Sequence, residues 1–113
     1  GILGVTFKEN VTDTRNSRVP DIAYELAEFG VQTLIHDPLA DPEVVREEYG
    51  LELSPLSELN GLHGLIIAVG HSDIRAGGVA PLAKRVVPGG VFVDLKSVFS
   101  PDSVPANLSY WSL

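Results

Sequence analysis

Short apolar segments alternate with amphipathic stretches along the whole chain. The apolar segments predict strands over residues 2–7, 31–36, 51–53, 64–69, 91–94 and 108–111. The segment 64–69, Gly-Leu-Ile-Ile-Ala-Val, is the most apolar and lacks the alternation of a strand with one solvent-facing side. Continuous apolar character indicates burial on both faces, so we expect this strand at the centre of a parallel sheet.

The amphipathic stretches predict helices between these strands. They cover residues 19–29, 42–49 and 79–87, the last ended by Pro88-Gly89-Gly90, with a weaker helical turn over 55–59. In the first helix, Ile22, Leu26 and Phe29 recur at i, i+4 and i+7 and form one apolar face. Asp41 suits the N-cap of the second helix, and Gly50 suits its C-terminal stop.

Strands that alternate with helices predict an α/β fold with right-handed crossovers. We expect one domain over residues 1–113, a Rossmann-like three-layer arrangement with a mostly parallel sheet of about five to six strands. The expected strand order is 3-2-1-4-5(-6), which places ligands at the carboxyl ends of the first and fourth strands. Those ends are Phe7-Lys8 and Gly70-His71-Ser72, and the neighbouring fifth strand ends near Lys96. Lys8 and Lys96 are therefore expected on one edge of the sheet.

The loop after the first strand concentrates positive charge in an acidic chain. The formal net charge is -7 with eight Lys and Arg residues, and this loop contains Lys8, Arg15 and Arg18. Lysine and arginine among hydroxyl and amide side chains suit an anion such as a diphosphate. The alternative is a solvated loop whose cations pair with neighbouring acids, namely Glu9, Asp13 or Asp21.

Composition excludes several classes of function. A pI near 4.7 argues against a general nucleic-acid binder, which needs a broad basic surface. No apolar segment approaches the roughly 20 residues that a membrane-spanning helix requires. The absence of cysteine removes disulfides, thiolate metal sites and a cysteine nucleophile, and the three histidines lack metal-ligand spacing. We therefore expect no metal site and no cysteine nucleophile in this chain.

Two further patterns have competing interpretations. Asp37 follows the second strand, where a dinucleotide-binding fold has its ribose-binding acid, but the G-x-G-x-x-G fingerprint is missing. Turn formation by Asp37-Pro38 is the favoured interpretation. His71-Ser72-Asp73 contains the residue types of a catalytic triad, yet a triad is defined by geometry and not by adjacency. Capping of a short turn by Ser72 or Asp73 is favoured there.

The strings T-F-K-E-N at residues 6–10 and D-T-R-N-S at 13–17 resemble the C-terminal UDP-binding domain of the UDP-glucose/GDP-mannose dehydrogenase family. Residues 37–38, 65–71 and 93–96 also fit that family, so the resemblance covers essentially the whole chain. With Glu48-Tyr49-Gly50-Leu51, the pattern is most similar to bacterial UDP-N-acetylhexosamine 6-dehydrogenases of capsule and O-antigen biosynthesis.

The resemblance implies a role for particular residues. Phe7, Lys8 and Lys96 match positions that contact the UDP-sugar substrate, and Arg15 matches an arginine that contacts NAD across a domain cleft. His71, Arg18 and Asp37 fit the family sequence without an assigned role. The implied reaction oxidises the sugar C6 hydroxyl to a carboxylate, with NAD held mainly by an N-terminal domain of the same polypeptide.

The same resemblance sets expectations for the whole protein. The chain begins inside a predicted strand and lacks methionine, so we interpret it as part of a longer polypeptide. The full-length enzyme is expected to be a cytoplasmic homodimer, and the isolated domain is predicted to be inactive. The alternative is a non-catalytic nucleotide-binding or assembly module with the same fold.

Overall fold

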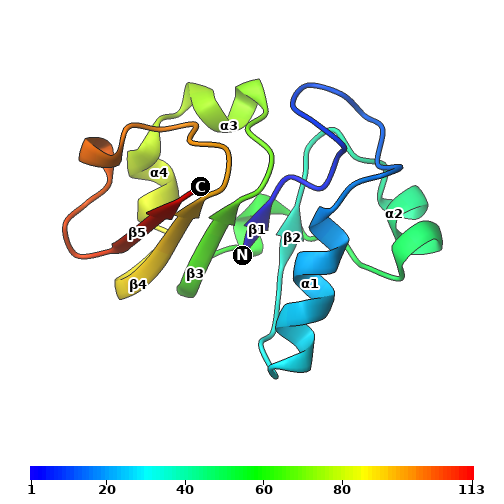
Figure 1. Cartoon of the computed structure of the whole chain (residues 1–113), viewed down its shortest axis with the longest axis horizontal. Helices are drawn as coiled ribbons and strands as arrows, with labels where there is room; N and C mark the ends of the chain where they lie inside the picture. Colours follow the sequence, from blue (N-terminus) through cyan, green and yellow to red (C-terminus); the bar gives the residue numbers. More distant parts are fainter.

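A parallel sheet in the order β2-β1-β3-β4-β5 organises the protein. The computed structural model describes all 113 residues (Figure 1). The strands are β1 (Ile2–Leu3), β2 (Ile35–His36), β3 (Leu62–Ile67), β4 (Val86–Asp94) and β5 (Ser109–Ser112). Leu53 forms a single parallel bridge with Ile35 beyond β2. The segment at Leu53 corresponds to the third predicted strand, so β3, β4 and β5 are the fourth, fifth and sixth. With this numbering the predicted order 3-2-1-4-5-6 is confirmed.

Helices cover both faces of the sheet and give the expected three layers. On one face lie α1 (Val19–Glu28) and α2 (Pro42–Tyr49), and on the other lie α3 (Ser72–Ala76), α4 (Val79–Ala83) and the short 3-10 turn η1 (Leu56–Glu58). A second 3-10 turn, η2 (Pro101–Ser103), precedes β5. Successive residues of a strand pack into the cores on opposite faces of the sheet: Ile2 packs with the α1 and α2 layer, whereas Leu3 packs with the α3 and α4 layer.

The predicted helix ends are largely confirmed. The α2 helix begins as expected, with the Asp41 side chain accepting a hydrogen bond from the Glu43 N–H. It ends at Gly50, whose φ of 67° lies in the left-handed region that favours glycine. The α1 helix spans the predicted residues except Phe29, which is its C-cap.

The first strand is shorter than the predicted residues 2–7, because the chain leaves the sheet at Gly4. This residue has a φ of 91°, and a Cβ at its position would lie 2.5 Å from the Cβ of Val69. The next two backbone N–H groups, of Val5 and Thr6, donate to the carboxylate of Asp37 instead of to a neighbouring strand. A tertiary contact thus ends β1 after two residues.

The predicted helix over residues 79–87 was wrong at its C-terminal end. The α4 helix stops at Ala83, and β4 already begins at Val86 and continues through Pro88-Gly89-Gly90. The ladder accommodates this run by a register shift: two steps along β3, from Leu62 to Gly64, correspond to five along β4. A β-bulge tolerates proline and glycine inside a strand, which is why the breaker signal was misleading.

The parallel ladder brings the carboxyl ends of three strands together. Leu3, Ile67 and Asp94 occupy one register row across β1, β3 and β4. We use the term carboxyl edge for the loops that leave these strands, residues 4–18, 68–71 and 95–100. In Figure 1 these loops lie along the upper side of the sheet, with α3 between the loop after β1 and the loop after β4. No helix of the fold combines the length and apolar character needed to cross a membrane.

Candidate functional site

Asp37 is the structural centre of the carboxyl edge. Its carboxylate is buried and accepts five hydrogen bonds. One oxygen, Oδ2, accepts from the N–H groups of Val5 and Thr6 at 2.7 and 3.2 Å, and from His71 Nε2 at 2.9 Å. The other, Oδ1, accepts from the N–H groups of its own turn, at residues 39 and 40. Asp37 therefore forms the expected turn and also ties the loop after β1 to β2.

Electrostatics at Asp37 favours the ionised carboxylate. Burial alone would raise the pKa of Asp37, but the hydrogen bonds from Val5 N–H, His71 and Leu39 N–H outweigh burial and lower it. With both oxygens engaged inside the protein, Asp37 has no free lone pair aimed at a ligand. It is therefore unsuited to bind a ribose hydroxyl, despite its position after the second strand.

His71 links the loop after β3 to the loop after β1. Its side chain is 1% exposed and contacts Asp37 and Thr6 through Nε2, while Nδ1 lies 2.9 Å from the backbone nitrogen of Asn10. A backbone N–H can only donate, so Nδ1 must be the unprotonated acceptor and Nε2 must carry the proton. The ring is thus held with Nδ1 as the acceptor and Nε2–H as the donor.

Asn10 completes this connection and was not identified from the sequence. Its Oδ1 accepts a hydrogen bond from Ser72 N–H at 2.9 Å, at the first turn of α3. The prediction that Ser72 or Asp73 caps this turn was wrong, because the cap comes from a loop sixty-two residues away. Asn10 has a positive φ of 61°, a conformation that asparagine tolerates better than most residues, so its residue type was the only signal in the sequence.

The residues predicted to contact substrate project from this anchored loop. Phe7 is 56% exposed although it is a large apolar side chain, and Lys8 is also exposed. Their backbone is fixed: Phe7 N–H donates to the carbonyl of Asp13, and the Thr6 hydroxyl donates to the carbonyl of Lys8 at 2.8 Å. An ordered backbone that presents an apolar ring and a cation to solvent is suited to a ligand with an aromatic or sugar part and an anionic part.

The two arginines of the loop form local ion pairs. Arg15 donates to Asp13 at 3.1 Å, and Arg18 donates to Asp21 at 3.3 Å, with all four side chains well exposed. The Arg15 hydrogen bond lowers the pKa of Asp13. Exposed pairs of this kind contribute little to stability, so the guanidinium of Arg15 can exchange its partner for an incoming anion at low cost.

Lys96 lies at the other end of the carboxyl edge, in the loop after β4. This loop is held by the fully buried Asp94, which accepts from the N–H groups of Val98 and Phe99 at 2.9 and 2.8 Å. The side chain of Lys96 is exposed. The prediction that Lys8 and Lys96 follow strands ending at the same edge is consistent with the register of the sheet.

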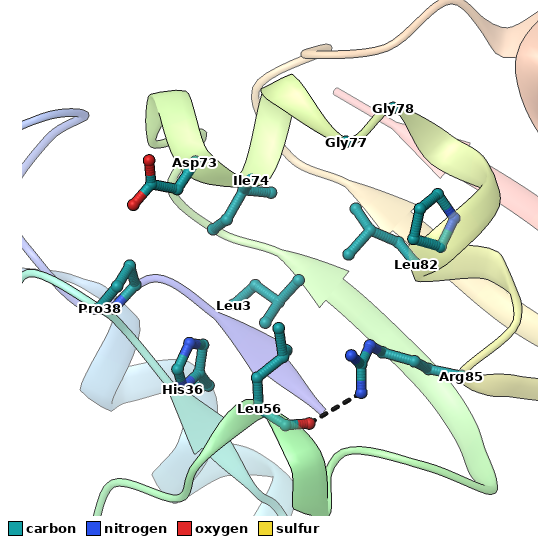
Figure 2. Close-up of a pocket in the computed structure, with 11 residues that line it drawn as sticks. Leu3, His36, Pro38, Leu56, Asp73, Ile74, Gly77, Gly78, Leu82 and Arg85 are labelled. Atoms are coloured by element: carbon teal, nitrogen blue, oxygen red, sulfur yellow. Dashed lines mark hydrogen bonds between the residues drawn. The ribbon is translucent and has the colours of Figure 1, made fainter.

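A separate pocket of about 300 Å³ lies over β1 and β2 and contains none of the predicted site residues (Figure 2). Its walls are mostly apolar, with Asp73 and Pro38 at one side and Arg85 at the other. The Arg85 guanidinium donates to the carbonyls of Leu56 and Leu59, so it holds η1 in place. The carboxyl edge remains the better candidate for anion binding, because its lysines have no protein partner. No cluster of three or more acidic or histidine side chains suitable for a metal ion occurs in the chain.

Comparison with known proteins places these features in a family context. Residues 1–101 match the family described as UDP-glucose/GDP-mannose dehydrogenase family, UDP binding domain. The chain is 38% identical over 109 residues to a UDP-N-acetyl-D-glucosamine 6-dehydrogenase of Salmonella typhi and 36% identical over 107 residues to one of Pseudomonas aeruginosa. Each match covers 95% of this chain and 25% of the relative, so the chain spans about a quarter of their length.

The fold also has close neighbours among solved structures. A UDP-D-ManNAc dehydrogenase from Pyrococcus horikoshii superimposes with a TM-score of 0.75, at 16% sequence identity, over 98% of this chain and 24% of that protein. At this identity the likeness shows the fold alone, which agrees with the three-layer parallel sheet described above.

Proposed function

The chain belongs to the UDP-glucose/GDP-mannose dehydrogenase family and spans its UDP-binding domain, and from this premise we propose that it holds the nucleotide half of a UDP-sugar during oxidation. The proposed reaction converts the sugar C6 hydroxyl to a carboxylate for polysaccharide biosynthesis by two successive hydride transfers to NAD, with water supplying the second carboxylate oxygen. The two relatives that act on UDP-N-acetyl-D-glucosamine support a UDP-N-acetylhexosamine as the substrate.

The observation that carries this proposal is the exposed pair Phe7 and Lys8 on a backbone that is tied down on both sides. Lys8 and Lys96 neutralise the charge of the diphosphate, and Phe7 packs against the nucleotide or sugar. Binding energy from this remote half of the substrate helps to position C6 for the reaction.

The residues of this chain do not fit an NAD site of their own. The glycine fingerprint is missing after β1, and Asp37 has both oxygens occupied. NAD is therefore assigned to an N-terminal domain of the same polypeptide, with Arg15 reaching it across the cleft. A cytoplasmic homodimer is the assembly we propose for the full-length protein.

Alanine substitution in the complete natural protein tests these roles. Lys8→Ala should raise the Kd of UDP about 10- to 100-fold, the range for losing a hydrogen bond to a charged group, and should leave NAD affinity close to wild type. Arg15→Ala should chiefly weaken NAD. Lys84→Ala is the matched control, because this exposed lysine follows α4 at the opposite end of the sheet. Titration calorimetry with UDP and NAD measures all three.

Two results would contradict the proposal. Equal losses of UDP and NAD affinity in Lys8→Ala and Arg15→Ala would remove the division of roles between these residues. Turnover of a UDP-sugar with NAD by residues 1–113 alone would refute the prediction that this domain is inactive without an NAD-binding partner.

A further inference from the structure

The loop that carries Phe7 and Lys8 has no regular secondary structure of its own. Between Gly4 and Arg18 it contains two residues with positive φ, Asn10 and Asn16, a conformation that costs free energy and persists only where surrounding contacts offset that cost. The loop is nevertheless joined to the sheet by hydrogen bonds from distant parts of the chain. These hydrogen bonds hold the backbone on which Lys8 lies.

A directed series of hydrogen bonds surrounds Lys8. His71 Nε2–H points at Asp37 Oδ2 (2.9 Å) and also lies 3.3 Å from Thr6 Oγ1. The Thr6 hydroxyl can accept there because its own proton is donated to the carbonyl of Lys8. On the other side of Lys8, the N–H of Asn10 donates to His71 Nδ1. One imidazole ring thus fixes the backbone before and after Lys8.

From this arrangement we infer that His71, Asn10 and Asp37 are positioning residues of the UDP site. Their proposed action is through the backbone of residues 6–10, which they hold so that the side chains of Phe7 and Lys8 meet the ligand without further ordering. A binding loop that is already ordered loses less conformational entropy when the ligand binds, which raises affinity. The inference depends on the proposed function, since it assigns these residues to the same site.

Two conservative substitutions of His71 separate positioning from general stability. Glutamine places its Nε2 donor near the position of the imidazole Nε2–H and keeps the bond to Asp37, but it offers no acceptor at the δ position. Asparagine places Oδ1 near the position of Nδ1 and keeps the acceptor for Asn10 N–H, but it loses the donor to Asp37. The two variants therefore retain opposite halves of the connection.

The expected orders of stability and affinity are opposite. His71→Gln should unfold at a urea concentration closer to wild type than His71→Asn, because the buried carboxylate keeps its side-chain donor. UDP affinity should follow the other order, with a Kd raised about tenfold in His71→Gln and less in His71→Asn. The matched control is His63→Gln, the same change at an exposed histidine of β3, which should alter neither property.

The outcome distinguishes this inference from the proposed function. If UDP affinity and stability fall in the same order, His71 acts on stability only and the inference is overturned. If the wild-type protein does not bind UDP, the proposed function fails instead. Amide hydrogen exchange then still tests the anchor, because Asn10 N–H should lose protection in His71→Gln and keep it in His71→Asn; equal protection in both would contradict the anchoring role.

Discussion

The loops after β1 and β4 both present a lysine at the carboxyl edge, and each is held by a buried aspartate. The aspartate of the β4 loop is local: Asp94 ends the strand and accepts from N–H groups four and five residues later. The aspartate of the β1 loop is remote: Asp37 directly follows the neighbouring strand β2 and accepts from N–H groups thirty-two and thirty-one residues earlier. The β1 loop also depends on His71, from the loop after a third strand, β3.

This difference shows how a longer loop can be given a fixed shape. The β4 loop is short enough for the aspartate at its start to accept from two of its own N–H groups. The β1 loop runs from Gly4 to Arg18, and the N–H groups of Val5, Thr6 and Asn10 are satisfied by side chains from the segments that follow β2 and β3. Loss of an anchor should therefore affect more of the molecule in the β1 loop than in the β4 loop.

Removal of the two aspartates should have the largest and most unequal effects. Asp37→Ala leaves four backbone N–H groups and His71 without their acceptor, and should lower the free energy of unfolding by about 3–5 kcal/mol. Asp94→Ala affects two N–H groups and should cost about 1–3 kcal/mol. Urea unfolding measures both. Equal losses would mean that the remote anchor is no more important than the local one.

Glycines at the starts of two loops should give the next largest difference. Gly4→Ala combines a φ of 91° with backbone atoms of Val69 at 2.8 and 2.9 Å from the new Cβ, and should cost about 3 kcal/mol. At Gly70 the nearest contact, 2.5 Å, is a methyl group of Val98, and φ is not positive. A side chain can move where a backbone cannot, so Gly70→Ala should cost about 1 kcal/mol. Thermal and urea unfolding compare them, and a larger loss at Gly70 would contradict this account.

The pH dependence of stability that comes from the β1-loop anchor Asp37 should be the smallest of these effects. The folded-state pKa of Asp37 is lowered, so its ionised form stabilises the protein above the unfolded pKa of about 3.9. That contribution is lost as the pH falls through the folded pKa. In Asp37→Asn the free energy of unfolding should therefore fall less steeply below about pH 5.

A residual pH dependence should remain in that variant. Hydrogen bonds from Arg15 and Arg46 lower the pKa of Asp13 and Glu52, and these pairs are unaffected by the substitution at residue 37. The quantity to measure is thus the difference in the free energy of unfolding between wild type and Asp37→Asn, from urea unfolding at about pH 3 to pH 7. A difference that stays constant across this range would contradict the stabilising role of the ionised Asp37 carboxylate.

The sequence predicted features that depend on neighbouring residues. Asp41 and Gly50 delimit α2 as expected, and the central strand predicted over residues 64–69 is present as β3, two residues earlier at each end, Leu62–Ile67. Features that depend on tertiary contacts were missed. The end of β1 is set by Asp37, and the start of α3 is satisfied by Asn10.

The same limit applies to the candidate site. The positive charge of Lys8 and its place after the first strand were visible in the sequence, as was the expected edge for Lys96. The tautomer and partners of His71 were not, because they depend on two loops meeting after the sheet has formed. Periodicity and local propensity contain no information about such contacts.

The remote anchoring of the β1 loop also has a consequence for synthesis of the protein on the ribosome. Thr6 emerges sixty-five residues before His71, its partner from the loop after β3. At about 5–20 residues per second, the loop waits roughly 3–13 s for that partner. During this interval β1 also lacks β3, one of its two neighbouring strands. We therefore expect the nascent chain, more than the finished domain, to need protection by chaperones.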